Sequence, residues 1–258
     1  MRNNLKGRDM SSPVVLITGA LTGIGRATAF AYAKEGARVA VSGRNEQTGA
    51  ELVRELSAAG AEAEFVRADV RREEDVKNLV EKTVSRFGRL DVAVNNAGTE
   101  GAMGLAADAT LENYQAIFDT NVLGVILSMK YEIRAMVPQG KGSIVNISSA
   151  YGKIGGPGAG IYVGSKHAVE GITKSAALEL AGSGVRVNVV GPGPIETAMF
   201  NRFAQTKENK AAFVEAQVPN KRMGNPEEIA DAIVFLGSDR ASYIIGASLA
   251  VDGGMIAG

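Results

Sequence analysis

The fold of this chain is decided by one stretch near its start, VVLITGALTGIG, which occupies residues 14–25. Its first part, Val14–Thr18, is a continuous apolar and β-branched run, typical of a strand covered on both faces. Glycines follow at positions 19, 23 and 25, and a helical pattern begins at Ile24. A strand that leads through a glycine-rich turn into a helix predicts the first βα unit of a parallel sheet.

The same alternation continues along the chain. We predict strands at Val14–Thr18, Arg38–Ser42, Ala63–Arg67, Asp91–Asn95, Gly142–Ser148, Arg186–Val190 and Ser248–Val251. We predict helices at Ile24–Glu35, Glu46–Ala59, Glu73–Phe87, Leu111–Met136, Tyr162–Ala181 and Pro226–Leu236. The last helix has a start signal, with Asn225 as N-cap before Pro226. This order predicts an α/β fold, a Rossmann-type doubly wound sheet of seven mainly parallel strands flanked by helices.

One domain accounts for the whole pattern. Residues 1–12 are polar and are expected to form a flexible tail. Residues 13–258 are expected to form a single dinucleotide-binding and catalytic domain, because no linker or internal repeat divides them. A long irregular-to-helical insertion, Glu196–Arg222, follows the sixth strand.

Composition excludes several classes of function. Of 258 residues, 45% are hydrophobic and 22% charged, and Lys plus Arg balance Asp plus Glu at 28 each. A net charge of zero argues against charge-driven binding to nucleic acid or to anionic membranes. Without cysteine the chain has no disulfide, no thiolate nucleophile and no Cys-ligated metal, and its one histidine, His167, cannot build a metal site. No apolar run could span a membrane or serve as a signal peptide, so the cytoplasm is the expected location.

The glycine turn has the features of a dinucleotide site. Gly19 permits the sharp turn, Gly23 lets a phosphate approach the backbone, and Gly25 allows close packing of helix on strand. The helix N-terminus would then present free N–H groups to a pyrophosphate. The alternative is that these glycines only form a tight βα turn.

The end of the second strand indicates which dinucleotide fits. Gly43 stands where an NAD site carries an acid for the ribose 2′-OH, and Arg44 follows. A guanidinium can pair with a 2′-phosphate, so NADP(H) is preferred and NAD(H) stays possible. The alternative is that Arg44 is a solvated surface residue. Asp69, after the third strand, is placed to accept from the adenine amino group, and the small residues of Asn95–Gly98 leave room for a ribose.

Four residues predict carbonyl chemistry. Tyr162 and Lys166 lie one helical turn apart, Ser149 ends the preceding strand, and Asn121 is a polar residue in an apolar neighbourhood. A free tyrosine has a pKa of about 10, and a nearby ammonium is expected to bring it to about 7–8. Ser149 could then hydrogen-bond the substrate oxygen. The alternative is that Tyr162 and Lys166 are ordinary surface neighbours.

These motifs resemble those of the short-chain dehydrogenases/reductases, in their single-domain branch, from Val14 to Gly254. The matching motifs are Thr18-Gly19-x-x-x-Gly23-x-Gly25, Asp69, Asn95-Asn96-Ala97-Gly98, Asn121, Ser149, Tyr162-x-x-x-Lys166, Pro192-Gly193-x-x-x-Thr197 and Val251-Asp252-Gly253-Gly254. The resemblance implies that Tyr162 is the general acid/base, that Ser149 orients the substrate and that Lys166 binds the nicotinamide ribose. It also implies that Asn121 holds a water linking Lys166 to solvent.

The resemblance extends to the cofactor and to the insertion. The implied cofactor contacts are Gly19, Thr22, Gly23, Ile24, Arg44, Asp69, Val70, Asn95, Ala97, Gly98, Tyr162, Lys166, Pro192, Gly193, Ile195 and Thr197. The insertion at about 196–222 is implied to be a mobile lid that excludes water, whereas it could also cover only a small core of its own. The expected substrate-lining residues are Ser149, Tyr151, Tyr162, Met199, Phe200 and Phe203, which favour a fairly apolar substrate.

The predicted function is NADP(H)-dependent hydride transfer between a ketone and a secondary alcohol. A 3-oxoacyl-carrier-protein reductase stays open, since Arg134 resembles one of its carrier-binding positions, although Leu178 occupies the second. An NAD-dependent alcohol or sugar dehydrogenase also stays open and, remotely, a non-catalytic cofactor sensor. The expected partners are a small-molecule substrate and, by the resemblance, the other subunits of a homotetramer, with neither nucleic acid nor membrane.

Overall fold

The computed structural model describes residues 12–257, so the predicted N-terminal tail lies outside the described residues apart from Ser12. Seven strands form one sheet in the order β3-β2-β1-β4-β5-β6-β7, and every neighbouring pair is parallel. The strands are β1 (Val14–Ile17), β2 (Arg38–Gly43), β3 (Ala63–Arg67), β4 (Val92–Asn95), β5 (Gly142–Ile147), β6 (Val185–Pro192) and β7 (Ser248–Val251). The predicted α/β fold is confirmed, with parallel pairing throughout the sheet rather than in most of it.

The strand order creates one crevice. The chain runs outward from β1 to β2 and β3, and then returns to place β4 on the other side of β1. The loops after β1 and β4 therefore diverge, which opens a ligand-binding crevice at the carboxyl edge of the sheet.

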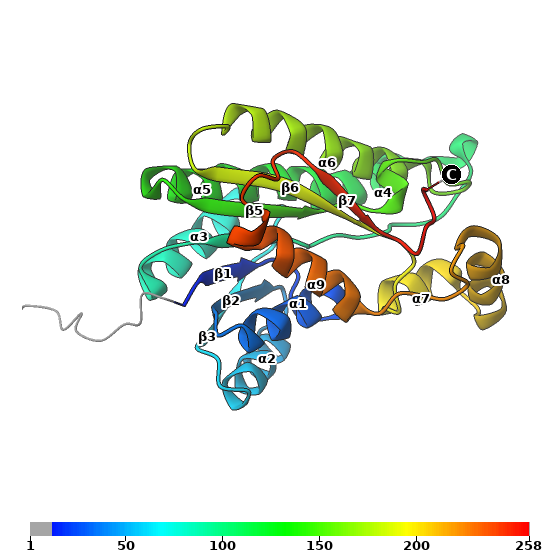
Figure 1. The fold of residues 1–258 in the computed structure, drawn as a ribbon. Helices are drawn as coiled ribbons and strands as arrows, with labels where there is room; N and C mark the ends of the chain where they lie inside the picture. Colours follow the sequence, from blue (N-terminus) through cyan, green and yellow to red (C-terminus); the bar gives the residue numbers. More distant parts are fainter. Residues whose placement is uncertain (1–11, 258) are drawn as a thin grey trace, which may run out of the picture.

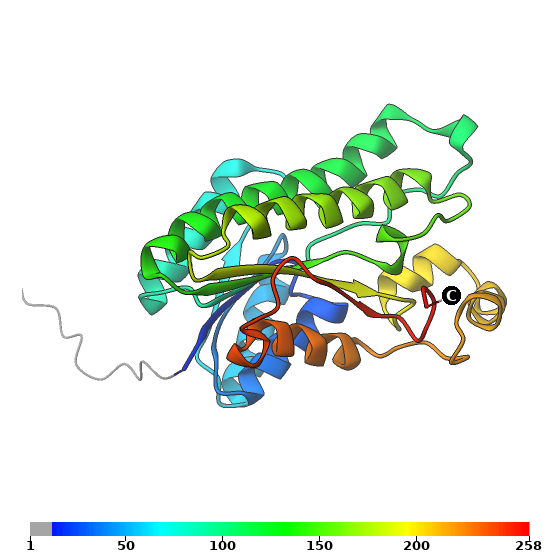
Figure 2. The ribbon, with the colours of Figure 1, turned by 45° about the horizontal axis from the view of Figure 1, so that its top comes forward.

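Helices cover both faces of the sheet (Figures 1 and 2). Alternate residues of β1 pack into hydrophobic clusters on opposite faces of the sheet. Val15 and Ile17 belong to the first cluster, and Val14 and Leu16 to the second. Strands buried on both faces read as continuous apolar runs, which is why the sequence pattern located them. The first cluster lies under α1 (Gly23–Lys34), α2 (Glu46–Ala58) and α9 (Pro226–Gly237), and the second under α3 (Glu73–Phe87), α5 (Gly124–Met136) and α6 (Gly160–Glu179).

The predicted helix Leu111–Met136 is interrupted by one irregular turn. It consists of α4 (Leu111–Phe118), a π-helical turn at Asp119–Leu123, and α5. Asn121 lies in this π turn and is buried. Such turns are rare and occur frequently at functional sites, so the interruption marks Asn121 more clearly than an ordinary helix would.

The insertion after β6 forms two short helices, α7 (Ala198–Ala204) and α8 (Lys207–Gln217). Figure 1 shows them beyond the sheet, at the carboxyl edge of the strands. The predicted N-cap of α9 is confirmed, because the backbone N–H of Asn225 donates to Glu228 Oε2 at 2.8 Å. Among residues 12–257, none of the helices combines the length and apolarity needed to cross a membrane.

Candidate active site

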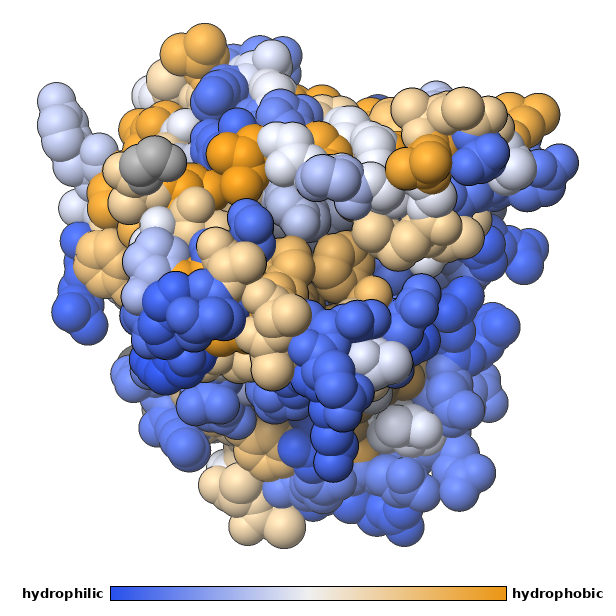
Figure 3. All heavy atoms as spheres, turned by 90° about the vertical axis from the view of Figure 1, so that its right-hand side faces the viewer, coloured by the Kyte–Doolittle hydropathy of each residue, from blue (hydrophilic) through white to orange (hydrophobic). Residues whose placement is uncertain are grey.

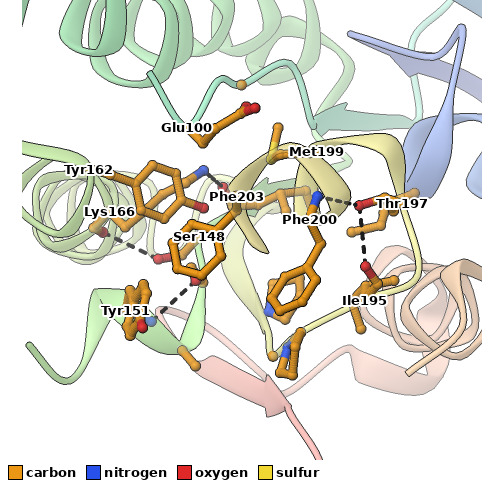
Figure 4. A pocket seen from close by; sticks show the side chains of 18 of the residues that line it. Glu100, Ser148, Tyr151, Tyr162, Lys166, Ile195, Thr197, Met199, Phe200 and Phe203 are labelled. Carbon is orange, nitrogen blue, oxygen red and sulfur yellow. Dashed lines mark hydrogen bonds between the residues drawn. The ribbon is translucent and has the colours of Figure 1, made fainter. Parts of the chain in front are cut away.

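A cavity of about 140 Å³ lies at the carboxyl edge of the sheet, between the loops after β4, β5 and β6 and the helix α7. Tyr162 and Lys166 of α6 line it together with Ser149, which follows β5 (Figure 4). Figure 3 views the molecule from this side, where apolar surface is concentrated in the upper half and the lower half is mostly hydrophilic. The structure thus brings the three predicted reaction residues into one cavity.

Lys166 and the two serines have distinct partners. Ser149 hydrogen-bonds the hydroxyl of Tyr162. Ser148 donates to the backbone oxygen of Lys166 at 3.2 Å, so it is Ser149 that faces the tyrosine hydroxyl. Lys166 Nζ donates to the carbonyl of Ile147 at 2.9 Å and lies over the Tyr162 ring, 5.7 Å from its centroid.

The predicted tyrosine pKa of about 7–8 is not what this environment produces. Burial raises the pKa of Tyr162 to about 12, with the Ser149 hydrogen bond opposing it and the charge of Glu100 adding to it. Burial also lowers the pKa of Lys166 to about 8, against the opposing charge of Glu170. The spacing predicted the attraction between the two residues but not the desolvation of both. At neutral pH Tyr162 therefore holds its proton.

Asn121 joins three elements at the cavity. Its side-chain Nδ2 donates to the Thr99 carbonyl at 2.9 Å and to Ser165 Oγ at 3.0 Å, and its Oδ1 accepts from the Thr99 N–H at 2.8 Å. A Cβ added to Gly98 would lie 3.3 Å from Asn121 Oδ1 and 3.7 Å from Lys166 Nζ. The side chain thus fixes the loop after β4 to α6, and the water-holding role of Asn121 stays a prediction.

A long groove of about 460 Å³ runs from the glycine turn to the same cavity. Gly19 has a φ of +63°, and a Cβ there would lie 2.8 Å from Ala97 Cα, so only glycine fits. A Cβ on Gly25 would lie 2.4 Å from the Gly19 carbonyl, which explains the need for a glycine where α1 packs on the turn. The predicted cofactor residues that line this groove are Gly19, Thr22, Gly23, Ile24, Arg44, Asp69, Val70, Ala97, Gly98 and Thr197.

The groove and the cavity are continuous. Ile24, Asn96, Gly98, Thr99, Thr197 and Met199 line both. The predicted nicotinamide-end residues Pro192, Gly193 and Ile195 line the cavity. Space for an extended ligand therefore runs from Arg44 to Tyr162. The glycine turn and the length of this space fit a dinucleotide.

The adenine end of the groove contains a residue that sequence reasoning missed. Arg71 lines the groove, and its guanidinium binds Asp69 with Nη2–Oδ2 at 2.6 Å. This hydrogen bond is the main reason that the pKa of Asp69 is lowered. An adenine amino group would have to share the Asp69 carboxylate with Arg71. The arginines at the end of β3 and just after it, at 67, 71 and 72, were the available signal.

Asn95 is predicted near the ribose, but its side chain does not line the groove, and its contact with the ribose stays a prediction. Its side chain is buried and donates from Nδ2 to Glu132 Oε2 at 3.0 Å and to Asn146 Oδ1 at 2.9 Å. As the last residue of β4, it points to the α5 face of the sheet. Asn96 lies in the groove instead and donates to the backbone oxygens of Thr18 and Gly19, which holds the glycine turn.

The buried Glu132 beside Asn95 makes stability depend on pH. Burial raises the pKa of Glu132 to about 8, with the Asn95 hydrogen bond opposing the shift. The folded state keeps a proton that the unfolded chain releases near pH 4.5. The free energy of unfolding should therefore fall as pH rises from about 4.5 to about 8, and Glu132→Gln should flatten that dependence. Urea unfolding at about pH 5 and pH 8 measures the free energy of unfolding of both proteins. The same change between the two pH values in both proteins would contradict the role of Glu132.

The two helices of the insertion, α7 and α8, supply an aromatic wall. Met199, Phe200 and Phe203 of α7 line the cavity as predicted, and Phe213 of α8 joins them. The Phe200 and Phe203 rings lie 5.5 Å apart, and Tyr151 faces Phe203 at 6.4 Å. Glu100 and Arg202, which the sequence did not single out, form an ion pair beside this wall.

The chain is similar to known proteins both in sequence and in structure. A family model described as enoyl-(acyl carrier protein) reductase matches residues 19–256. The chain is 42% identical over 250 residues to a 2,5-dichloro-2,5-cyclohexadiene-1,4-diol dehydrogenase of Sphingobium indicum, covering 96% of this chain and 99% of the relative. It is 40% identical to a cyclohexanol dehydrogenase of an Acinetobacter species, covering 94% of each. Among solved structures, an actinorhodin polyketide ketoreductase variant with NADPH has a TM-score of 0.90 at 38% identity, covering 95% of this chain and 97% of that one.

Proposed function

The chain belongs to the short-chain dehydrogenase/reductase family and is an oxidoreductase of carbonyl and alcohol groups, and from that premise we propose that it interconverts a ring ketone and its secondary alcohol with NADP(H). The observation that carries the proposal is the continuity of the dinucleotide groove with a cavity that holds Tyr162, Ser149 and Lys166. Turnover of a panel of neutral ketones with NADPH, followed by nicotinamide absorbance, tests it. Absence of turnover across that panel would contradict it.

Each of the three residues has a separate task in reduction. When bound, a reduced nicotinamide supplies a hydride to the carbonyl carbon. Ser149 and Tyr162 hydrogen-bond the carbonyl oxygen, which gains negative charge as the C=O π bond breaks. Tyr162, protonated at neutral pH, transfers its proton to that oxygen. The Lys166 ammonium stabilises the resulting phenolate, which then takes a proton from solvent.

The lining of the cavity supports an apolar ring substrate. Four aromatic side chains, Tyr151, Phe200, Phe203 and Phe213, form one wall. Two relatives are named for oxidation of ring alcohols, a chlorinated cyclohexadiene diol and cyclohexanol. Reduction of a carrier-bound 3-oxoacyl chain is less well supported, because Leu178 is 78% exposed where a basic carrier contact is expected.

One guanidinium group supports a preference for NADP(H). Arg44 lines the groove next to Gly43, which stands where an NAD site carries an acid, whereas Arg71 is paired with Asp69. Two structures similar to this chain have NADPH or NADP bound.

Arg44→Ala should raise the KM for NADPH by about 10- to 100-fold, because a charge-assisted contact with the 2′-phosphate is lost. The KM for NADH, which has no 2′-phosphate, should change little. Steady-state kinetics of both proteins with both cofactors measure the effect. Equal losses with NADPH and NADH would contradict recognition of the 2′-phosphate.

Exposed apolar residues support a homotetramer. On the helices α4 and α6, Leu111 is 65% exposed and Leu178 78%. Near the last strand, Tyr243 is 99% exposed and Ile245 44%. Contacts between subunits at both places would cover these side chains. Light scattering gives the mass of the assembly.

A further inference from the structure

A carboxylate stands inside the apolar cavity. Among the residues that line it, Glu100 is the one acidic side chain, and it is 9% exposed. It follows β4 by five residues, on the loop that Asn121 holds. Figure 4 places it above Tyr162 and beside Met199 in the view. A buried charge needs a partner, and the mechanism gives Glu100 no task.

The partner of Glu100 comes from the lid. Arg202 of α7 donates from Nε to Glu100 Oε1 at 2.6 Å and from Nη2 to Oε2 at 3.2 Å. This two-point contact fixes the orientation of both groups. The Glu100 side chain is 11% exposed, whereas that of Arg202 is 62% exposed and lines the groove. The pair therefore lies at the boundary between the substrate cavity and the groove.

The negative charge of Glu100 acts on Tyr162. It contributes to raising the pKa of Tyr162, after burial as the main cause. An anionic group on a substrate in this cavity would experience the same negative charge. The guanidinium that could have bound such a group is already engaged by Glu100.

We propose that Glu100 is a specificity-determining residue that restricts the cavity to uncharged substrates by repelling anions and by occupying Arg202. The inference rests on the proposed function, in that the cavity binds the carbonyl substrate. It assigns the enzyme to neutral ketones and alcohols and excludes keto acids. Without the Glu100 charge, Arg202 becomes a free cation at the cavity and should accept a substrate carboxylate.

A matched pair of substrates tests this specificity. One is a cyclohexanone that carries a carboxylate on the ring carbon opposite the carbonyl, and the other is its methyl ester. In Glu100→Gln, the ratio of kcat/KM for the acid to that for the ester should rise by about 10- to 100-fold, the range of one charge-assisted hydrogen bond. In Glu100→Gln with Arg202→Gln that gain should disappear. If Glu100 had a purely structural role, the substitution would lower kcat/KM for both substrates by the same factor and leave the ratio unchanged.

A control variant and a binding measurement complete the design. Glu196→Gln removes a lid carboxylate that pairs with Lys210 outside the cavity lining, and it should not change the ratio. Calorimetry with cyclohexanecarboxylate separates this inference from the proposed function, because it requires no turnover. Tighter binding to Glu100→Gln than to the wild type supports the inference even if neither ketone is reduced. Equal binding, with melting curves that show both proteins folded, overturns it.

Discussion

Tyr162→Phe is expected to lower kcat/KM for ketone reduction by about 100- to 10,000-fold, the range of a lost general acid. The phenol is half-buried, bonded to Ser149 and protonated at neutral pH, and phenylalanine keeps its ring but has no proton to give. The affinity for NADPH and the melting temperature should stay close to those of the wild type, since only a hydroxyl is removed. Steady-state kinetics, cofactor titration and thermal melting measure the three quantities.

The control for this variant is Tyr131→Phe. It removes a hydroxyl on α5, outside the cavity lining, that donates to Glu73 of α3. Its turnover should equal that of the wild type. Turnover by Tyr162→Phe within a factor of about three of the wild type would remove Tyr162 from the chemical step, because such a factor is far below the contribution of a general acid.

Lys166→Met is expected to lower kcat by about 100-fold or more, because the phenolate left by proton transfer loses the ammonium over its ring. The wild type should also lose reductase activity as pH rises through about 8, where Lys166, with its pKa lowered by burial, releases its proton. The ammonium is present below that pH and absent above it. The variant should lack this part of the pH profile.

The same lysine predicts a matching change in stability. The unfolded chain binds the lysine proton more tightly than the folded state does, so the unfolding free energy should rise as pH rises from about 8 to 10.5. Lys166→Met should remove this dependence. Identical pH profiles of activity and of stability for variant and wild type would contradict the assignment of the shift to Lys166.

Much of the fold could be predicted because its signals are local. Strands such as Val14–Ile17 are buried on both faces, and Gly19 and Gly25 stand where a side chain would collide with the backbone. The π turn at Asp119–Leu123 could not be predicted, since one wider turn barely changes the apolar pattern of a helix. Which face of the sheet carries the Asn95 side chain could not be predicted for a related reason. At the end of a strand, one step in register exchanges the two faces of the sheet.

The environment of the site depends on contacts distant in sequence. The spacing of Tyr162 and Lys166 brought both into the cavity, but their burial depends on how the loops and the lid pack around them. Glu100 and Arg202 are 102 residues apart, so no local pattern connects them. Arg71 was near enough to Asp69 to be noticed, and it shows that an acid after a strand need not be free for a ligand.

The transfer of a labelled hydride tests whether the enzyme reduces a ketone with Tyr162 as the proton donor. The enzyme is incubated with cyclohexanone and NADPH that carries deuterium at the transferable position of the nicotinamide, and the product is analysed by mass spectrometry. The account predicts cyclohexanol with one deuterium on the carbinol carbon from the wild type, and almost none in the same time from Tyr162→Phe. Product without label, or equal labelled product from both proteins, would contradict it.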